Sequence, residues 1–386
     1  SNWQAFQWPE SAMALSLSTI LFLALLHECD AGHRVVHDDS QALAGWMGEN
    51  FEALRDRTLM QMTLPGSHNS GNYEGGLSAS LTCSSDYGYF KGYQKAARAV
   101  GEQPMTQRSF DERMIPWNIN HFTPIPEQLR RDGARYFHLK ICNFGQPGAA
   151  TMDLSSVRFQ HRGYTTQETV ASTLEDMKAF LAEHPRELIV LGFNNLHNAA
   201  PGGFGSEDIL ALSSALVAEI GTQHLVRKEE LYHSTLGELL AAGKRFAVFM
   251  GGSSSIAGKL PSGVIPSSEA LAEDWDDVMA SGDLDASRAW LVRDVHEKAA
   301  HHNRFYVMQA NPNNNEELMY QAMIAGRGPQ SNKAFLAPFL NSLGDLVMGA
   351  VSSSPASRIN VVSTDFLNVS RPYDIAMKLM GLSVYV

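Results

Sequence analysis

Two histidines of the chain each follow a segment with the composition of a short strand. His68 lies in Leu-Pro-Gly-Ser-His-Asn-Ser and His161 lies in Phe-Gln-His-Arg-Gly. Imidazole gains and loses a proton near neutral pH, so two histidines that face one substrate can serve as general base and general acid. Such a pair suits phosphodiester cleavage, in which the attacking oxygen loses a proton and the leaving oxygen gains one.

Further polar side chains follow other predicted strands, and they include one cation and one carboxylate. Because the carboxyl ends of the strands of a (β/α) barrel meet at one face, we expect these residues to converge there. A lone histidine in such a place is more often structural, so the convergence carries the prediction. We expect the two histidine rings to face each other across an open pocket, together with Lys140, Asn194, Asn195, Gln309, Asn311 and Asp365.

The elements that would position these residues alternate between strands and helices. Short apolar runs predict the strands, and apolar residues at helical spacing predict the helices. This alternation favours a single α/β domain, a distorted (β/α)8 TIM barrel. The predicted strands are 58–64, 135–142, 157–160, 187–193, 245–250, 305–310 and 359–366, and the predicted helices are 42–55, 125–131, 166–184, 209–220 and 236–242.

Residues 73–120 show little periodicity and are rich in Gly, Ser, Tyr and Lys. We interpret them as a long loop excursion after the first strand, with helix near 93–100, that crosses the barrel mouth. Its aromatic residues could form a membrane-facing rim, because aromatic side chains favour the membrane interface. Packing of the excursion onto the barrel is the alternative that we favour for Tyr87, Tyr89, Tyr93, Trp117 and Phe122.

Length and charge limit the function classes. The chain has 386 residues, 44% of them hydrophobic, which is enough for one large α/β domain. Its net charge of -11 excludes a nucleic-acid binder, since a phosphate backbone requires a basic footprint. Anionic membranes would repel the chain on average, although a local basic or aromatic patch could still provide a peripheral membrane contact. No feature of the sequence indicates the oligomeric state.

The apolar run 12–26 is shorter than the roughly 20 residues of a bilayer span. It fits the hydrophobic region of a signal peptide, although the usual basic start is missing, and a buried helix is the alternative. We therefore predict a signal-like or anchoring segment at 1–40, a barrel at 41–386, and a secreted, extracellular or membrane-associated protein. The three cysteines of the chain lack zinc-ligand spacing. Cys83 and Cys142 could form a disulfide if the chain is exported.

Several blocks in the same order resemble the phosphatidylinositol-specific phospholipase C (PI-PLC) X-domain family, especially its metal-independent bacterial enzymes and its X-domain-only eukaryotic proteins. The resemblance covers most of residues 58–380. It implies a distorted, partly open TIM barrel that cleaves the glycerol–phosphate bond of inositol phospholipids or their glycan-linked relatives. The blocks are LPGSHNSG (64–71), EQLRRDGARYFHLKI (127–141), FQHRGY (159–164), ASTLEDMKAFLAEHPRELIVLGFNN (171–195), FYVMQ (305–309) and INVVSTDF (359–366).

The resemblance also implies roles for the site residues. His68 matches the base, His161 the acid, and Asp365 the carboxylate behind the base, although a turn aspartate is an alternative for Asp365. Lys140 stands where the metal-independent relatives use an arginine, so the cation is a point charge without a bidentate fork. Asn69 stands where the bacterial enzymes have an aspartate that assists the second histidine, so His161 is expected to be less basic.

The resemblance further implies that the site uses no metal and no cofactor. Calcium-dependent relatives place acidic ligands on the second strand, and YFHLKI (136–141) has none. His138 stands where an acidic residue is usual, so it is a third site histidine or a supporting one. Asn194, Asn195, Gln309 and Asn311 complete the expected substrate-binding set for a phospholipid or other phosphodiester. Basic residues that bind inositol in the bacterial enzymes are absent, so that style of inositol recognition is not supported.

Two alternative functions stay open. Glycerophosphodiester phosphodiesterases also combine a TIM barrel with a His-Arg-Gly signature like residues 161–163, but theirs lies on the first strand and is accompanied by acidic metal ligands. The other alternative is a catalytically idle family member with a structural or lipid-binding role, which the loss of the arginine and the aspartate would permit. Retention of both histidines argues against this second alternative.

Overall fold

The computed structural model describes residues 43–83, 88–252, 254–273, 277–297, 303–354 and 358–384. They all belong to the unit Ser40–Val386. The predicted segment 1–40, with its apolar run, lies outside the described residues, as does Tyr87. Among the described helices none is by itself long and apolar enough to span a membrane, and one pair bent by 42°, α14 (Asn332–Leu340) with α15 (Leu343–Ser353), meets the length and composition criteria jointly.

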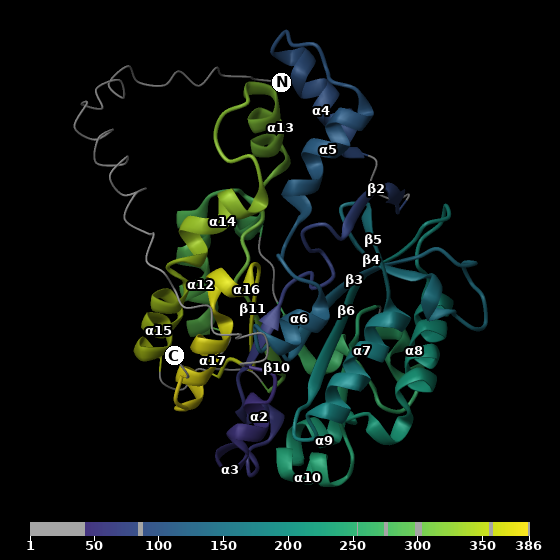
Figure 1. Ribbon diagram of the computed structural model, residues 1–386, viewed down its shortest axis with the longest axis vertical. Helices are drawn as coiled ribbons and strands as arrows, with labels where there is room; N and C mark the ends of the chain where they lie inside the picture. Colours follow the sequence, from purple (N-terminus) through teal and green to yellow (C-terminus); the bar gives the residue numbers. More distant parts are fainter. Residues whose placement is uncertain are drawn as a thin grey trace. The chain divides into compact units, whose positions relative to one another are not determined.

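A path of parallel strands forms the centre of the fold (Figure 1). Among the described residues no pairing joins β8 to β9, so the barrel is open at that seam. This arrangement confirms the prediction of a distorted (β/α)8 barrel and shows where it is distorted. In order across the sheet the parallel strands are β8 (Val264–Pro266), β7 (Phe246–Met250), β6 (Ile189–Asn198), β3 (Tyr136–Asn143), β1 (Leu64–Ser67), β11 (Val361–Thr364), β10 (Phe305–Gln309) and β9 (Leu271–Glu273).

The central strands are continuous apolar runs because both of their faces are covered. Every residue of β7 and of β10 is buried. Alternate side chains of β6 face different layers: Leu191 packs with the outer helices, while Val190 packs in the barrel interior. In that interior the rings of Phe249 and Phe305 lie 5.5 Å apart. Burial on both faces thus accounts for the strands that the sequence predicts most clearly.

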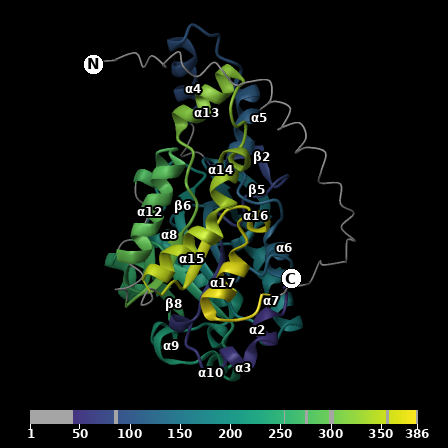
Figure 2. The ribbon, with the colours of Figure 1, turned by 90° about the vertical axis from the view of Figure 1, so that its left-hand side faces the viewer.

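Most helices cover the outside of the sheet. α4, α5 and α13 instead lie together at one end of the described unit, above the strands in both Figures 1 and 2. At the opposite end in both views lie α3 (Phe51–Leu54), α9 (Lys228–His233) and α10 (Leu236–Ala241). The end group above the strands is α4 (Gly88–Ala99), α5 (Gln107–Asn118) and α13 (Glu316–Ala325), and the helices beside the strands are α2 (Trp46–Glu49), α6 (Ile125–Arg130), α7 (Val170–Glu183), α8 (Ser206–Ile220), α11 (Ser267–Ala270), α12 (Leu284–Glu297), α15, α16 (Leu367–Ser370) and α17 (Pro372–Met380).

The first barrel strand lies later in the chain than predicted. The sequence predicts a strand over 58–64 that Pro65 and Gly66 terminate. In the structure residues 59–61 form a 3-10 turn, and Pro65 and Gly66 lie inside β1. A Cβ atom on Gly66 would lie 2.4 Å from Cγ1 of Val361 on the neighbouring strand. The glycine is therefore a close-approach residue within the strand rather than a terminator.

The predicted strand 157–160 is not part of the barrel path. β4 (Val157–His161) runs antiparallel to β3 and forms a hairpin with β5 (Tyr164–Thr169). Arg162 and Gly163 turn the hairpin with φ of 47° and 85°. The helix predicted to begin at residue 166 begins only at Val170, because the threonine-rich segment before it pairs as a strand.

The excursion after the first strand is confirmed, but it has more structure than expected. It contains β2 (Leu77–Thr82), which pairs with β5, and the helices α4 and α5. A disulfide joins Cys83, just after β2, to Cys142 on β3, with 6.0 Å between their Cα atoms. The excursion is thus tied covalently to a barrel strand that carries candidate site residues.

Candidate active site

His68 and Asp365 lie at the ends of neighbouring strands. Ser67 of β1 is in register with Thr364 of β11. The residues that follow them, His68 and Asp365, therefore lie next to each other. Nδ1 of His68 lies 2.8 Å from Oδ1 of Asp365. A carboxylate oxygen accepts, so Nδ1 carries the proton and Nε2 is the basic nitrogen. Oδ2 of Asp365 accepts from the amides of Asn120 and Asn332 at 2.9 and 3.3 Å.

Burial decides the charge state of this pair. Removal from water lowers the pKa of His68 well below 6.5, and the positive charge of Lys140 lowers it further. Burial raises the pKa of Asp365 to about 6, against the opposing effects of His121 and Lys140. At neutral pH the imidazole is therefore neutral and its carboxylate ionised, which is the form that a general base requires.

His161 lies at the tip of the β4–β5 hairpin. Its Nδ1 donates to the carbonyl oxygen of Asn118, 3.2 Å away, so Nε2 is unprotonated in the neutral ring. Nε2 lies 3.5 Å from the amide nitrogen of Asn69. Burial lowers the pKa of His161 well below 6.5, and the charges of Lys140 and Arg162 add to this effect. Asn69 is not among these causes, so the expectation that asparagine at position 69 leaves His161 less basic stays a prediction.

Asn69 itself has a left-handed backbone, with φ of 48°. Asparagine tolerates this conformation better than most residues other than glycine. The turn immediately after His68 holds the amide of Asn69 beside His161. The two candidate catalytic histidines are thus linked by one residue that follows the first of them in sequence.

His138 lies beside His68 and has a defined proton position. Its ring stacks on His68 with 5.1 Å between centroids and 17° between planes. The backbone N–H of Asn69 donates to Nδ1 of His138 over 3.3 Å, so the proton of the neutral ring is on Nε2. That nitrogen lies 3.8 Å from Oε1 of Glu273. Burial lowers the pKa of His138 well below 6.5, so the ring buttresses His68 as a neutral group.

An open pocket lies beside His138 and Lys140, which both line it. Asn194 donates to Oε2 of Glu273 at 2.9 Å, and the amide of Gln309 donates to Oε1. Burial raises the pKa of Glu273, and the two amides and Lys140 oppose this rise. The pocket is lined by both polar and apolar residues. They are His138, Lys140, Asn194, Asn195, Leu196, Phe204, Ile209, Gly251, Gly252 and Glu273.

The predicted site residues fall into two groups that His138 connects. His68, Asn69, His161 and Asp365 form a covered group, and the open pocket contains Lys140, Asn194 and Asn195, with Gln309 bound to its carboxylate. His68 is 0% and His161 5% exposed, so the pair does not line an open pocket as expected. Asn311 is fully buried, and within the described chain neither atom of its amide has a hydrogen-bond partner.

Several site residues have no clear signal in the sequence. Glu273 ends a strand of only three residues, which is too short for a recognisable pattern. Asn118, Asn120 and His121 lie in the excursion or just after it. His121 Nε2 lies 2.7 Å from the carbonyl oxygen of His68 and so donates to it. Only the clustering of polar residues in the stretch NINH (118–121) could have drawn attention to that segment.

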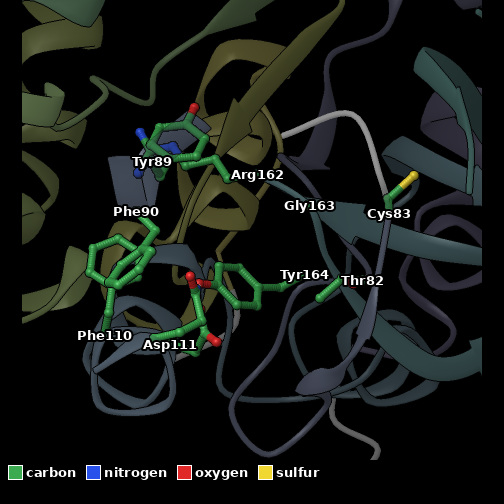
Figure 3. Close-up of a pocket in the computed structure, with 10 residues that line it drawn as sticks. Thr82, Cys83, Tyr89, Phe90, Phe110, Asp111, Arg162, Gly163 and Tyr164 are labelled. Carbon is green, nitrogen blue, oxygen red and sulfur yellow. The ribbon is translucent and has the colours of Figure 1, made fainter. Parts of the chain in front are cut away.

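Of the described aromatic residues considered for a membrane-facing rim, Tyr93 and Trp117 are buried, whereas Tyr89 and Phe122 are half-buried. Trp117 and Tyr93 are 1% and 3% exposed. Figure 3 shows the small pocket that Tyr89, Phe90 and Phe110 form beside Arg162 and Tyr164. The Arg162 guanidinium lies 5.8 Å from the centre of the Tyr89 ring and donates to the carbonyl oxygen of Asn314. These contacts fasten the hairpin tip that carries His161.

The described residues hold no group of three or more His, Cys, Asp or Glu side chains arranged to bind a metal ion. Site carboxylates have other partners: Asp365 contacts His68 and two amides, and Glu273 contacts two amides. A metal-independent site remains a prediction that requires an assay with chelator.

No family model matches the sequence. The chain is 25% identical to human PI-PLC X domain-containing protein 1 over 203 residues, which is 53% of this chain and 55% of that protein. It thus matches the curated relative over about half of that relative's length.

Solved structures resemble the fold over most of the chain. PI-PLC of Staphylococcus aureus has a TM-score of 0.53 at 14% identity, covering 90% of this chain and 99% of the enzyme. PI-PLC of Listeria monocytogenes has a TM-score of 0.52 at 10% identity with the same coverage. These matches confirm the resemblance inferred from the sequence blocks. The sequence of this chain resembles an X-domain protein over about half of the chain, and its fold resembles bacterial PI-PLC over most of the chain.

Proposed function

We propose, from this resemblance to the PI-PLC X-domain family, that the protein is a phosphodiesterase that cleaves the glycerol–phosphate bond of an inositol phospholipid or a related phosphodiester. The observation that carries the proposal is the hydrogen bond between His68 and Asp365, in a covered group that also contains His161. The fold alone would not support an activity, since one fold serves many functions. Base, carboxylate and acid in one group supply the required chemistry.

In the proposed reaction Nε2 of His68 takes the proton of a head-group hydroxyl, and the hydroxyl oxygen attacks phosphorus. The bond between phosphorus and the glycerol oxygen breaks, and His161 gives a proton from Nε2 to that oxygen. The products are a cyclic phosphodiester and the free glycerol lipid. Asp365 keeps His68 in the required tautomer and stabilises the imidazolium that forms. Each proton transfer of this kind contributes roughly 10²- to 10⁴-fold to the rate.

Lys140 is the proposed cation for the phosphate. Its charge lowers the pKa values of His68, His138 and His161, which supports a place for Lys140 beside the reacting groups. Negative charge grows on the phosphate oxygens during the reaction, and a fixed cation stabilises it. Lysine provides this charge without the two-pronged geometry of arginine.

Asn69 allows His161 to change its protonation state. An amide can present its nitrogen as a donor to neutral Nε2 or, after rotation, its oxygen as an acceptor to protonated Nε2. The bound phosphodiester brings negative charge near His161 and raises its pKa, so proton uptake accompanies binding. The asparagine thus tolerates the acid form without favouring it as strongly as an aspartate would.

The open pocket is the proposed head-group site. His138, Asn194, Asn195 and Gln309, with Glu273, offer donors and acceptors suited to a hydroxylated head group, and we propose Asn311 as a further contact. The buried position of His68 and His161 favours one alternative specifically, an idle family member that binds lipid. The His-Arg-Gly turn at a hairpin tip, away from the first strand, disfavours the glycerophosphodiester phosphodiesterase alternative.

One assay separates these functions. Phosphatidylinositol, glycerophosphoinositol and glycerophosphocholine are each incubated with the protein in two parallel series, one with a chelator and one with added divalent cations, and phosphorus NMR identifies the products. Release of cyclic inositol phosphate from phosphatidylinositol supports the proposal. Metal-dependent cleavage of the glycerophosphodiesters supports the phosphodiesterase alternative, and absence of cleavage with retained lipid binding supports the idle one.

A further inference from the structure

Helix α4 has one buried face and one basic face. Tyr93 and Ala97 are buried, and Lys91, Lys95 and Arg98 are exposed. The three basic residues are spaced by four and three positions, so they lie along one side of the helix. Helix α4 is therefore amphipathic. Its apolar side packs on α5 and α13, and its basic side does not.

The basic face carries uncompensated charge. Within the described chain none of these three side chains makes an ion pair. Residues 88–100 contain Lys91, Lys95 and Arg98 and no acidic residue, in a chain whose net charge is -11. Val100, one residue past the helix, is 65% exposed. Charge and an exposed apolar side chain thus coincide at one place.

This basic face belongs to the end of the described unit that carries the candidate site. Tyr93 of α4 packs against Phe110 of α5, with ring centroids 5.2 Å apart. At its other end α5 reaches the site, where the carbonyl of Asn118 accepts from His161 and Asn120 donates to Asp365. Figures 1 and 2 both show α4 at this end, opposite α3 and α10.

We propose that the exposed face of α4, formed by Lys91, Lys95 and Arg98 with Val100 at its end, docks the protein on an anionic lipid surface. The partner follows from charge complementarity and from shape: a convex helix face with a neighbouring apolar residue lies in the headgroup plane of a bilayer. A lipid rather than an acidic protein is chosen because the proposed function places the substrate in a membrane. Docking through α4 would bring the site end toward the bilayer.

The test measures binding of the full chain to sedimented vesicles of phosphatidylcholine alone and of phosphatidylcholine mixed with phosphatidylglycerol. The variant Lys91→Gln/Lys95→Gln/Arg98→Gln is compared with Arg55→Gln/Arg358→Gln/Lys378→Gln. The control removes the same charge from exposed positions at the other end of the unit. Each basic residue near an anionic membrane adds to the binding free energy. The loss of three such residues is therefore predicted to weaken vesicle binding by on the order of 100-fold.

The proposal predicts that the unaltered chain binds the mixed vesicles, that salt weakens this binding, and that only the α4 variant loses it. Equal binding by both triple variants, or absence of preference for anionic vesicles, overturns it. The result does not depend on catalysis, because hydrolysis of a water-soluble phosphodiester is measured separately. Vesicle binding without hydrolysis would contradict the proposed function alone, and hydrolysis without vesicle binding would contradict the docking alone.

Discussion

His68 and Asp365 are almost three hundred residues apart in sequence, yet Nδ1 of one lies 2.8 Å from Oδ1 of the other. Parallel pairing of β1 with β11 produces this contact, because both residues directly follow paired strands. The carboxylate is itself held by Asn120 and Asn332. A fixed carboxylate that orients an imidazole is the arrangement on which the proposed base depends.

Asp365→Asn is predicted to lower kcat on a soluble phosphodiester by about 10³- to 10⁴-fold, because an amide that donates to Nδ1 forces the wrong tautomer of His68. Steady-state kinetics measure the loss, and circular dichroism checks the fold. Asp345→Asn, at an exposed position of α15, is the matched control. Near-normal kcat in Asp365→Asn would show that Asp365 is only a turn residue.

Asn69→Asp is predicted to raise the pKa of His161, since a carboxylate near Nε2 stabilises the imidazolium by roughly one pKa unit or more. The alkaline limb of the kcat/KM profile should therefore move to higher pH. Asn69→Gly, which also suits the left-handed backbone at φ of 48°, is the control without the charge. A profile that moves equally in both variants would exclude the electrostatic explanation.

The disulfide between Cys83 and Cys142 closes a chain segment of 59 residues. Cross-linking a segment of this length limits the unfolded chain and contributes about 4 kcal/mol. Cys83→Ser/Cys142→Ser is thus predicted to lower the free energy of unfolding by about that amount, measured by urea denaturation. The unaltered protein with reductant should show a similar loss. Unchanged stability in both would contradict a structural role for the bond.

Asp132 is predicted to make stability depend on pH. Burial raises its pKa to about 6, above the usual 3.8. Its protonated form therefore favours the folded state at low pH, and this contribution is lost as the pH rises through about 6. Asp132→Asn should raise the free energy of unfolding by about 1 to 2 kcal/mol near neutral pH and change it little below about pH 4. A gain that is equal at both pH values would contradict this cause.

The parts of the fold that the sequence predicts well are those with strong burial patterns. β7 and β10 are apolar at nearly every position, and their bounds agree with the prediction within about one residue. β8 and β9 have three residues each and no pattern, so they and Glu273 were not predicted. The antiparallel course of β4 depends on its pairing with β5, which local sequence does not encode.

The candidate site was predicted as a set of residues but not as a geometry. His68, Asp365 and Asn69 follow β1 and β11, so strand ends identify them. His161 donates to the carbonyl oxygen of Asn118, which ends a helix of the excursion. This contact joins residues far apart in sequence, so local sequence does not predict it. His138 shows the same limit, because its proton position follows from a backbone N–H that only the folded chain brings near.

The assignment of His161 as general acid is tested by comparing two substrates that differ only in the leaving group. An alkoxide leaving group needs a proton, whereas p-nitrophenolate leaves without one. The comparison includes His68→Ala, and His233→Ala at an exposed position of α9 as the control. His68→Ala should be impaired on both substrates, since the base is required for each.

The most direct measurement is therefore kcat/KM of His161→Ala on inositol phosphodiesters with glycerol and with p-nitrophenol as leaving groups, in the presence of a chelator. The acid–base account predicts a loss of roughly 10²- to 10⁴-fold with the glycerol substrate and a much smaller loss with p-nitrophenol. Equal losses on both substrates, or full activity of His161→Ala on the glycerol substrate, would contradict it.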